Sequence, residues 1–171
     1  MFPAELFRFC PRCGAARAAA NVGQIPLRCE ACGLVFFFNP TVSAAAFVFD
    51  SLGRALFIRR AHEPAKGKLG IPGGFGDIGE TAEAAVRREV REEVGLEVEN
   101  VVFLGSFPND YHYREVTYPV VDLVFTASAI EPESARSLDG VLGLEWHRPA
   151  DVDANELAFP SIRHFAHALH R

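Results

Sequence analysis

The chain has 171 residues, of which 49% are hydrophobic and 23% charged, so it can bury a sizeable core and intrinsic disorder is excluded. It has no apolar run near the roughly 20 residues that cross a bilayer, and its start lacks a basic segment followed by an apolar stretch. We therefore expect a cytoplasmic protein without a membrane partner. The net charge of −5 also disfavours a nucleic-acid partner, because binding phosphates needs a positive surface.

The first 40 residues differ from the rest of the chain in charge and composition. They hold four Arg and two Glu, a net charge of +2, which leaves −7 for the remainder. They are rich in Cys, Gly, Ala and Arg and show no sustained helical or strand period. We interpret residues 1–38 as a small separate domain, and its basic character leaves a partner of its own open.

The four cysteines of the chain form two C-x2-C pairs, Cys10 with Cys13 and Cys29 with Cys32, separated by 15 residues. This spacing is typical of a zinc ribbon, in which four thiolates surround one Zn²⁺. Such a site is structural rather than catalytic, because no ligand position stays open for water. Disulfides and a redox-active C-x2-C pair are the alternatives, and disulfides suit a cytoplasmic protein less well.

Residues 39–171 alternate apolar runs with turn signals, as expected of a larger globular domain. Strands are predicted at 42–49, 54–59, 98–107, 116–127 and 142–146, and a loop at 131–140. The first two of these strands form a hairpin around a turn at residues 50–53. Residues 61–80 contain two prolines and six glycines, which predicts a loop too long to be a simple connection. A loop of this kind is expected to be functional.

Two helices are predicted in this larger domain. Within residues 81–94 apolar side chains recur at every fourth position, and Gly95 stands where a C-terminal cap belongs. The second helix begins at Pro160, because proline suits the first helical turn, and runs to about His170.

The first predicted helix carries three carboxylates on one face. Glu89, Glu92 and Glu93 are related by spacings of three and four residues, and like charges so placed repel by a few tenths of a kcal/mol per pair, roughly. Something should offset that repulsion. Mg²⁺ prefers carboxylate oxygens, which points to metal-assisted phosphoryl chemistry. The alternative is a solvated surface helix on which the carboxylates pair with neighbouring arginines, at positions 87, 88 and 91.

The loop and helix together resemble the Nudix box, G-x5-E-x7-R-E-U-x-E-E-x-G-U, where U is bulky and aliphatic. The match runs from Gly74 to Leu96, and every specified position is filled. The resemblance extends from Arg59-Arg60 to Phe159-Pro160-Ser161 and so covers nearly the whole chain. One departure is Leu69-Gly70-Ile71, where relatives often place a Trp; this changes packing under the loop and removes no metal ligand.

The resemblance implies an α/β/α sandwich around a mixed sheet over residues 39–171, preceded by the zinc ribbon. It also implies water attack on a diphosphate linked to a nucleoside, assisted by Mg²⁺ or Mn²⁺. The implied magnesium ligands are Glu89, Glu92, Glu93 and the carbonyl oxygen of Gly74. Arg88 orients a glutamate through a charge-assisted pair, and Glu80 is a second member of that network. Which glutamate deprotonates water stays open, since Glu92 is closer to the general base in some relatives.

A zinc ribbon joined to a Nudix domain resembles the architecture of NADH pyrophosphatases and of some FAD or ADP-ribose pyrophosphatases. We therefore expect cleavage of the diphosphate bridge of a dinucleotide such as NADH or FAD, or of ADP-ribose. The NADH-specific pattern S-Q-P-W-P-F-P-x-S is absent, because residues 105–113 read GSFPNDYHY. The rival activities are nucleoside-triphosphate pyrophosphatase and RNA cap hydrolase. A rival of another class is a nucleotide-sensing regulator whose ribbon binds nucleic acid or protein, although the intact box disfavours it.

Several aromatic and histidine residues have two interpretations. Tyr111 and Tyr113 either stack on a nucleotide base or pack as ordinary strand and loop aromatics. His62 and His112 are weak candidates for substrate contact. Three histidines spaced by three residues on the last helix could bind metal, but we expect surface histidines: His164, His167 and His170. A homodimer is also considered.

Overall fold

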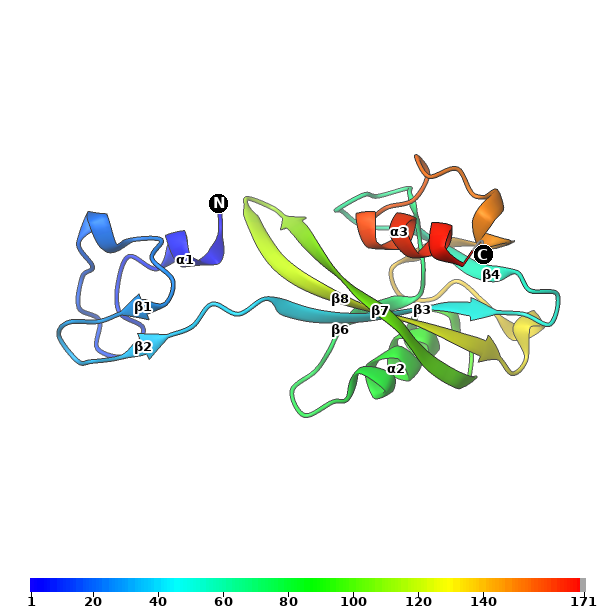
Figure 1. Cartoon of the computed structure of the whole chain (residues 1–171), viewed down its shortest axis with the longest axis horizontal. Coiled ribbons are helices and arrows are strands. Elements are labelled where there is room, and N and C mark those ends of the chain that lie inside the picture. Colours follow the sequence, from blue (N-terminus) through cyan, green and yellow to red (C-terminus); the bar gives the residue numbers. More distant parts are fainter. Residues whose placement is uncertain (170–171) are drawn as a thin grey trace. The chain divides into compact units, whose positions relative to one another are not determined.

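A computed structural model describes residues 1–169. Its largest element is a mixed seven-stranded sheet with the order β5-β4-β3-β8-β7, to which β6 adds beside β3 and β9 beside β4 (Figure 1). The strands are β3 (Thr41–Phe49), β4 (Ala55–Arg60), β5 (Leu69–Gly70), β6 (Gly73–Phe75), β7 (Val98–Tyr113), β8 (Val116–Ala129) and β9 (Val141–His147).

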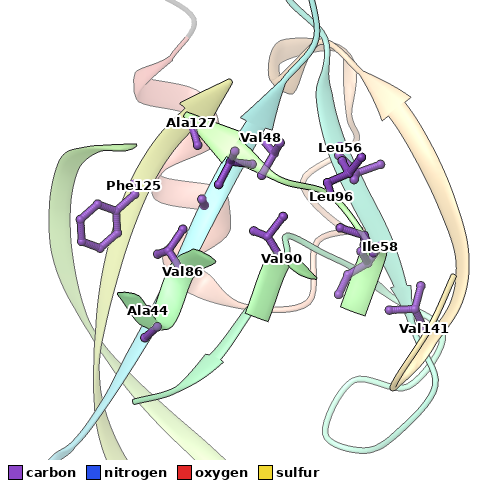
Figure 2. Packing of buried hydrophobic residues seen from close by; sticks show 14 residues of the cluster. Ala44, Val48, Leu56, Ile58, Val86, Val90, Leu96, Phe125, Ala127 and Val141 are labelled. Atoms are coloured by element: carbon purple, nitrogen blue, oxygen red, sulfur yellow. The ribbon is translucent and has the colours of Figure 1, made fainter. Parts of the chain in front are cut away.

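Two helices cover opposite faces of this sheet, α2 (Ala82–Val94) and α3 (Pro160–Ala168) (Figure 1). Successive residues of a strand point to opposite faces, and β3 follows this rule. Val48 packs in the cluster that contains Val86 and Val90 of α2, as Figure 2 shows. Its neighbour Phe47 packs in the second cluster, which contains the apolar residues of α3. The predicted α/β/α sandwich is confirmed.

The ends of α2 follow from its capping residues. The hydroxyl of Thr81 accepts a hydrogen bond from the backbone N–H of Ala84 at 3.2 Å. At the other end Gly95 adopts φ = 69°, in the left-handed region, and its N–H donates to the carbonyl of Arg91 at 3.0 Å. The predicted helix is confirmed to within one residue. The last helix begins at Pro160 as predicted, and its predicted end at His170 lies outside the described residues.

Two sequence predictions need correction. Residues 61–80 are not wholly loop, because β5 and β6 form within them. Backbone pairing rather than side-chain propensity builds β6: a methyl group at Gly73 would stand 2.4 Å from Cβ of Ala45 on β3. The strand β7 also continues past Pro108, where we expected it to end. It lies at the edge of the sheet, where proline is tolerated.

The chain forms two compact units, of which the first comprises Met1–Thr41 and Asp110–Val120 and the second comprises the rest. The hairpin tip joins the first unit through Met1, whose amino group donates to the carbonyl of Glu115 at 3.1 Å and whose carbonyl accepts from the N–H of Thr117 at 2.8 Å. The boundary between residues 38 and 39 stays a prediction. The remaining short elements are α1 (Pro3–Leu6), η1 (Ala19–Asn21), β1 (Leu27–Arg28), β2 (Val35–Phe36), η2 (Pro132–Ser134) and η3 (Pro149–Asp151). No helix in the described part is both long and apolar enough to span a membrane.

Candidate active site

The glycine-rich strand β6 lies directly against the acidic face of α2. A methyl group at Gly74 would stand 2.5 Å from Oε1 of Glu89, so only glycine lets the main chain approach this carboxylate so closely. The N–H of Gly73 donates to Oε2 of Glu93 at 3.0 Å. Two of the three predicted metal-binding glutamates therefore lie beside the glycine loop.

Arg88 is the centre of an ion-pair network that joins the loop to the helix. Its Nε and Nη2 donate to the two carboxylate oxygens of Glu80, each at 3.0 Å. Its Nη1 donates to Glu89 at 2.8 Å and to Glu92 at 3.0 Å, and Nη2 also reaches the carbonyl of Phe75 at 3.0 Å. One guanidinium thus fixes three carboxylates, a geometry that a single ammonium group does not reproduce.

The neighbouring arginines do not share this role. Arg91 pairs with Glu97 at 2.6 and 2.9 Å, and Arg87 donates to the carbonyl of Val98. Within residues 1–169, Glu93 has no Lys, Arg or His nitrogen within 4.0 Å. Pairing with arginine therefore explains Glu89 and Glu92 in part and leaves Glu93 unexplained.

Removal from water dominates the electrostatics of Glu93. Desolvation raises its pKa to about 8, and the hydrogen bond from Gly73 offsets this only in part. The nearby charge of Glu89 raises this pKa further, as does Asp139, whereas Arg60 lowers it. The charged form of Glu93 is thus poorly compensated by the protein alone, and a bound cation would supply the missing charge.

Desolvation also raises the pKa of Glu89, against the lowering effect of Arg88. Glu80 shows the opposite behaviour, because its bonds from Arg88 lower its pKa. Glu80 is therefore the ionised partner of Arg88. In Glu89 and Glu93 the ionised form is disfavoured, and a bound cation would stabilise it. In residues 1–169 these glutamates do not form a group of three whose ligand atoms lie within 4.8 Å of one another. Substrate phosphate and water would have to complete such a site.

The four cysteines do gather, with all four sulfur atoms within 4.8 Å of one another. The Sγ atoms of Cys10 and Cys32 lie 3.7 Å apart, as do those of Cys13 and Cys29. A tetrahedron with Zn–S bonds of about 2.3 Å has edges of about 3.8 Å, whereas a disulfide needs about 2.05 Å. The cysteines are free thiols, so the four-cysteine cluster is confirmed and the disulfide alternative is not.

The two cysteine turns have the same backbone geometry. The N–H of Gly14 donates to the carbonyl of Cys10 and that of Gly33 to the carbonyl of Cys29, both at 2.9 Å. The two glycines have φ values of 72° and 73°, a conformation that glycine adopts at low cost.

The thiols do not ionise alike. Hydrogen bonds, first from the backbone of Cys13, lower the pKa of Cys10 to about 6. The backbone hydrogen bond from Leu34 lowers the pKa of Cys32, but desolvation and the neighbouring thiols together outweigh it and raise this pKa to about 12. All four groups would be thiolates together only beside a bound cation, which offsets their mutual repulsion.

Comparison with known proteins identifies the larger unit. A model of the NUDIX domain matches residues 39–169. The chain belongs to the Nudix family. The structure of a NUDIX hydrolase from Nitrosomonas europaea has a TM-score of 0.72 to this one at 22% identity, covering 95% of this chain and 90% of that chain. The NUDIX domain of Shewanella oneidensis NrtR, solved with ADP ribose, has a TM-score of 0.64 at 23% identity, with coverages of 79% and 90%.

Curated Nudix relatives are longer than this chain. The NAD-capped RNA hydrolase NudC of Vibrio vulnificus is 32% identical over 144 residues, which are 75% of this chain and 54% of the relative. The protein of the same name from Chromobacterium violaceum is 38% identical over 103 residues, 59% of this chain and 38% of the relative. The chain thus spans about half, or less, of the length of these relatives.

Several residues near the Nudix box had no role in the sequence prediction. They are the N–H of Gly73, the carbonyl of Phe75, and the charges of Arg60 and Asp139 near Glu93. Gly73 and Arg60 lie in segments that carry the family resemblance, but their contacts follow from the pairing of strands. Asp139 comes from the loop before β9, and no spacing in the sequence links it to the box.

The weaker candidates lie outside the box. Tyr111 and Tyr113 belong to the hairpin tip of the first unit, where the Arg114 guanidinium lies 5.4 Å from the centre of the Tyr113 ring. His112 is hydrogen-bonded to the hydroxyl of Thr117 at 2.9 Å. Base stacking by the two tyrosines stays a prediction.

The other histidines lie in the second unit. His62 lies near Gly140, at 3.9 Å from a methyl group built on it. On α3, His164 and His167 are exposed, and the ring of His164 packs against Phe107 at 5.0 Å. His170 lies outside the described residues.

Proposed function

We propose that this protein hydrolyses the diphosphate bridge of a nucleoside-diphosphate-linked compound with the help of Mg²⁺ or Mn²⁺. The observation that carries the proposal is Glu93, a partly buried carboxyl of raised pKa that lies beside the glycine loop and has no arginine partner among residues 1–169. A divalent cation would stabilise the ionised form of such a buried carboxyl. The complete Nudix box favours phosphoryl chemistry assisted by that cation.

The protein's own residues divide the work between binding and orientation. Glu89, Glu93 and the carbonyl oxygen of Gly74 would hold the cation, with Glu92 as a third carboxylate ligand or as the general base. Such a cation would supply positive charge to the phosphates and lower the pKa of the attacking water. Arg88 holds Glu89 and Glu92 in place and is itself held by Glu80. Glu92 is the most exposed of these carboxylates, with 54% of its side chain accessible, which suits a base that exchanges protons with solvent. This exposure favours Glu92 as the general base over a third metal ligand.

The preferred substrates are ADP-ribose and dinucleotides such as NADH or FAD. The first is supported by the NrtR domain solved with ADP ribose. The relatives named NAD-capped RNA hydrolase favour capped RNA as a second candidate, and they bring back a nucleic-acid partner that the net charge disfavoured. Nucleoside-triphosphate pyrophosphatase and a regulatory role are the remaining rivals. A cytoplasmic location and a homodimer stay predictions.

We also propose that Cys10, Cys13, Cys29 and Cys32 bind one structural Zn²⁺. Sulfur separations that match the edge of a zinc tetrahedron support this assignment. The site has four protein ligands, so it would stabilise the first unit and take no part in catalysis.

The test is a screen of NADH, FAD, ADP-ribose, diadenosine polyphosphates and nucleoside triphosphates with Mg²⁺ or Mn²⁺. We expect two phosphate-bearing products from a diphosphate-bridged substrate. In ¹⁸O-labelled water the label should appear on phosphorus of one product and not on a sugar carbon. Release of inorganic phosphate from a nucleoside monophosphate, or no turnover of any of these compounds, would overturn the proposal.

A further inference from the structure

A buried carboxylate on the face of the sheet opposite α2 has three neutral partners, and no cation among the described residues. Asp122 on β8 is only 8% exposed. Its Oδ1 accepts a hydrogen bond from the hydroxyl of Ser43 on β3, and its Oδ2 accepts from the hydroxyl of Ser161 at 2.6 Å and from the amide of Asn109 at 3.0 Å. Among the described residues it makes no ion pair. A negative charge buried in this way is costly, so its retention calls for a reason.

The carboxylate determines which way the amide of Asn109 points. An ionised carboxylate only accepts hydrogen bonds, so the NH₂ group of Asn109 must face Asp122. The carbonyl oxygen Oδ1 must then face away from Asp122. No donor to this oxygen is present within residues 1–169, and Asn109 is partly exposed. Asp122 thus fixes the orientation in which Oδ1 of Asn109, on β7, is available as a hydrogen-bond acceptor.

Asp122 and its partners are connected to the Nudix box through the paired strands β3 and β6. The strand order places Ser43, Asp122 and Asn109 on the three adjacent strands β3, β8 and β7. Ser43 is the register partner of Phe75 on β6, and directly opposed residues point to the same face. The carbonyl of Phe75 is held by Arg88, which also binds Glu89. The aromatic ring of Phe75 therefore lies on the face of Asp122, while its main chain belongs to the catalytic network.

The separation of Asn109 from the strand β6 along the sheet suits a nucleotide. The strands β6, β3, β8 and β7 are separated by three strand spacings, which amount to about 14 Å. A nucleoside linked to a diphosphate has a length of that order, so its base can approach Asn109 while its phosphates lie beside the edge strand β6. An aromatic ring and a directed polar group are the usual elements of base recognition.

We propose that Asn109 and Asp122 form the base-recognition site of this enzyme. The Oδ1 atom of Asn109 accepts a hydrogen bond from an exocyclic amino group on the substrate base, and Asp122 is the positioning residue that keeps the amide in this orientation. Adenine and cytosine carry such a group, whereas hypoxanthine and uracil present a carbonyl oxygen at the same place and would be repelled. This inference rests on the proposed function only in assuming a nucleotide substrate.

The test measures binding of mononucleotides to the full chain by calorimetry, so it does not depend on turnover. We expect AMP to bind about tenfold more tightly than IMP, or CMP than UMP, the difference between one made and one unmade hydrogen bond. The pair that shows the preference identifies the base. In Asn109→Leu the preference should fall to within about twofold. Equal binding of both members of both pairs by the wild type, or no binding, would overturn the proposal.

A second variant separates positioning from a merely structural role. Asp122→Asn keeps the size of the side chain but can both donate and accept, so the amide of Asn109 is no longer forced into one orientation. We expect the preference for the base with an exocyclic amino group (AMP over IMP, or CMP over UMP), called the amino preference below, to fall or reverse in this variant. A structural role alone would weaken AMP and IMP equally and keep their ratio, which would contradict the positioning role.

Two further variants serve as controls. Ser106→Ala changes an exposed residue on the same strand and should leave binding of both nucleotides unchanged. Ser43→Ala removes a donor to Asp122 without touching Asn109; it should lower the melting temperature and keep the AMP-to-IMP ratio. The binding test is also separate from the hydrolysis screen. Loss of the amino preference in Asn109→Leu together with no hydrolysis would refute the proposed reaction and not the base site, whereas hydrolysis with an unaltered preference would refute only the base site.

Discussion

At the scale of single residues, Glu93 separates a catalytic from a structural reading of the acidic helix. Its pKa is raised to about 8 in the folded chain from an ordinary value of 4.5, so the folded state holds its proton more tightly than the unfolded state between these values. Wild-type stability without Mg²⁺ should therefore fall as the pH rises from 4.5 through 8. Glu93→Gln lacks this loss and should be more stable than the wild type by about 1–3 kcal/mol at pH 9, with little difference at pH 4.5. Urea unfolding at both pH values measures this.

The same substitution should abolish most activity. A missing ligand misplaces the cation that neutralises the phosphates, an effect of several kcal/mol, so kcat should fall at least about a hundredfold. Mg²⁺ should raise the melting temperature of the wild type more than that of Glu93→Gln, because a ligand that binds only the folded state stabilises it. A variant that melts much earlier and keeps its turnover would show that the carboxylate serves the fold.

Arg88 tests whether the guanidinium shape or only its positive charge matters. Arg88→Lys keeps the charge but cannot reach Glu80, Glu89 and Glu92 together. We expect kcat to fall about 10- to 100-fold, as for other residues that orient metal ligands. The matched control is Arg91→Lys, three residues along the same helix, whose partner Glu97 is exposed and lies outside the box. Steady-state kinetics should show a change within about twofold there, and similar losses in both variants would argue against the network.

At the scale of elements, the sequence predicts well what depends on local signals. The helix α2 is predicted to within one residue because its cap residues Thr81 and Gly95 act locally. The strand β6 is missed because it contains two glycines, which disfavour strands, and exists only through pairing with β3. For the same reason the contact from Gly73 to Glu93 could not be predicted: the box names the glutamate, but only the sheet places the N–H beside it.

The two glycines of β6 should respond differently to a methyl group. At Gly73 the new Cβ would meet Cβ of Ala45 at 2.4 Å and its backbone at 2.5 Å, which cannot move easily. Gly73→Ala should therefore destabilise the fold by about 1–3 kcal/mol. At Gly74 the new Cβ would meet the end of the Glu89 side chain at 2.5 Å, which can turn away. Gly74→Ala should keep its melting temperature within a few degrees, approximately, but lose about tenfold or more in kcat. Thermal melts and kinetics on both variants check this, and the reverse pattern would contradict the site geometry.

At the scale of the whole molecule, one chain holds two compact units that we expect to depend on metal in different ways. The second unit has two apolar clusters on either side of its sheet, large enough to hold it together without a ligand. In the first unit, the segment that carries the four cysteines has only short elements, and its largest sheet is a pair of two-residue strands. A module of this size usually needs a metal or disulfide to fold, and its cysteines are free.

Zinc loss should therefore affect the two units unequally. We predict one zinc per chain, measured by elemental analysis of protein purified without chelator. In Cys29→Ser, hydrogen exchange should accelerate throughout Met1–Thr41, because structural zinc supplies the folding free energy of such a segment. Exchange should also accelerate at the amide of Thr117, which donates to the carbonyl of Met1. Thr117 is 88 positions from the substituted Cys29 in sequence (117 − 29). The amides of α2 should keep their protection, since their hydrogen bonds and apolar contacts lie in the second unit. Absence of zinc in the wild type would refute the site, and equal acceleration in α2 would show that the metal holds the whole chain together.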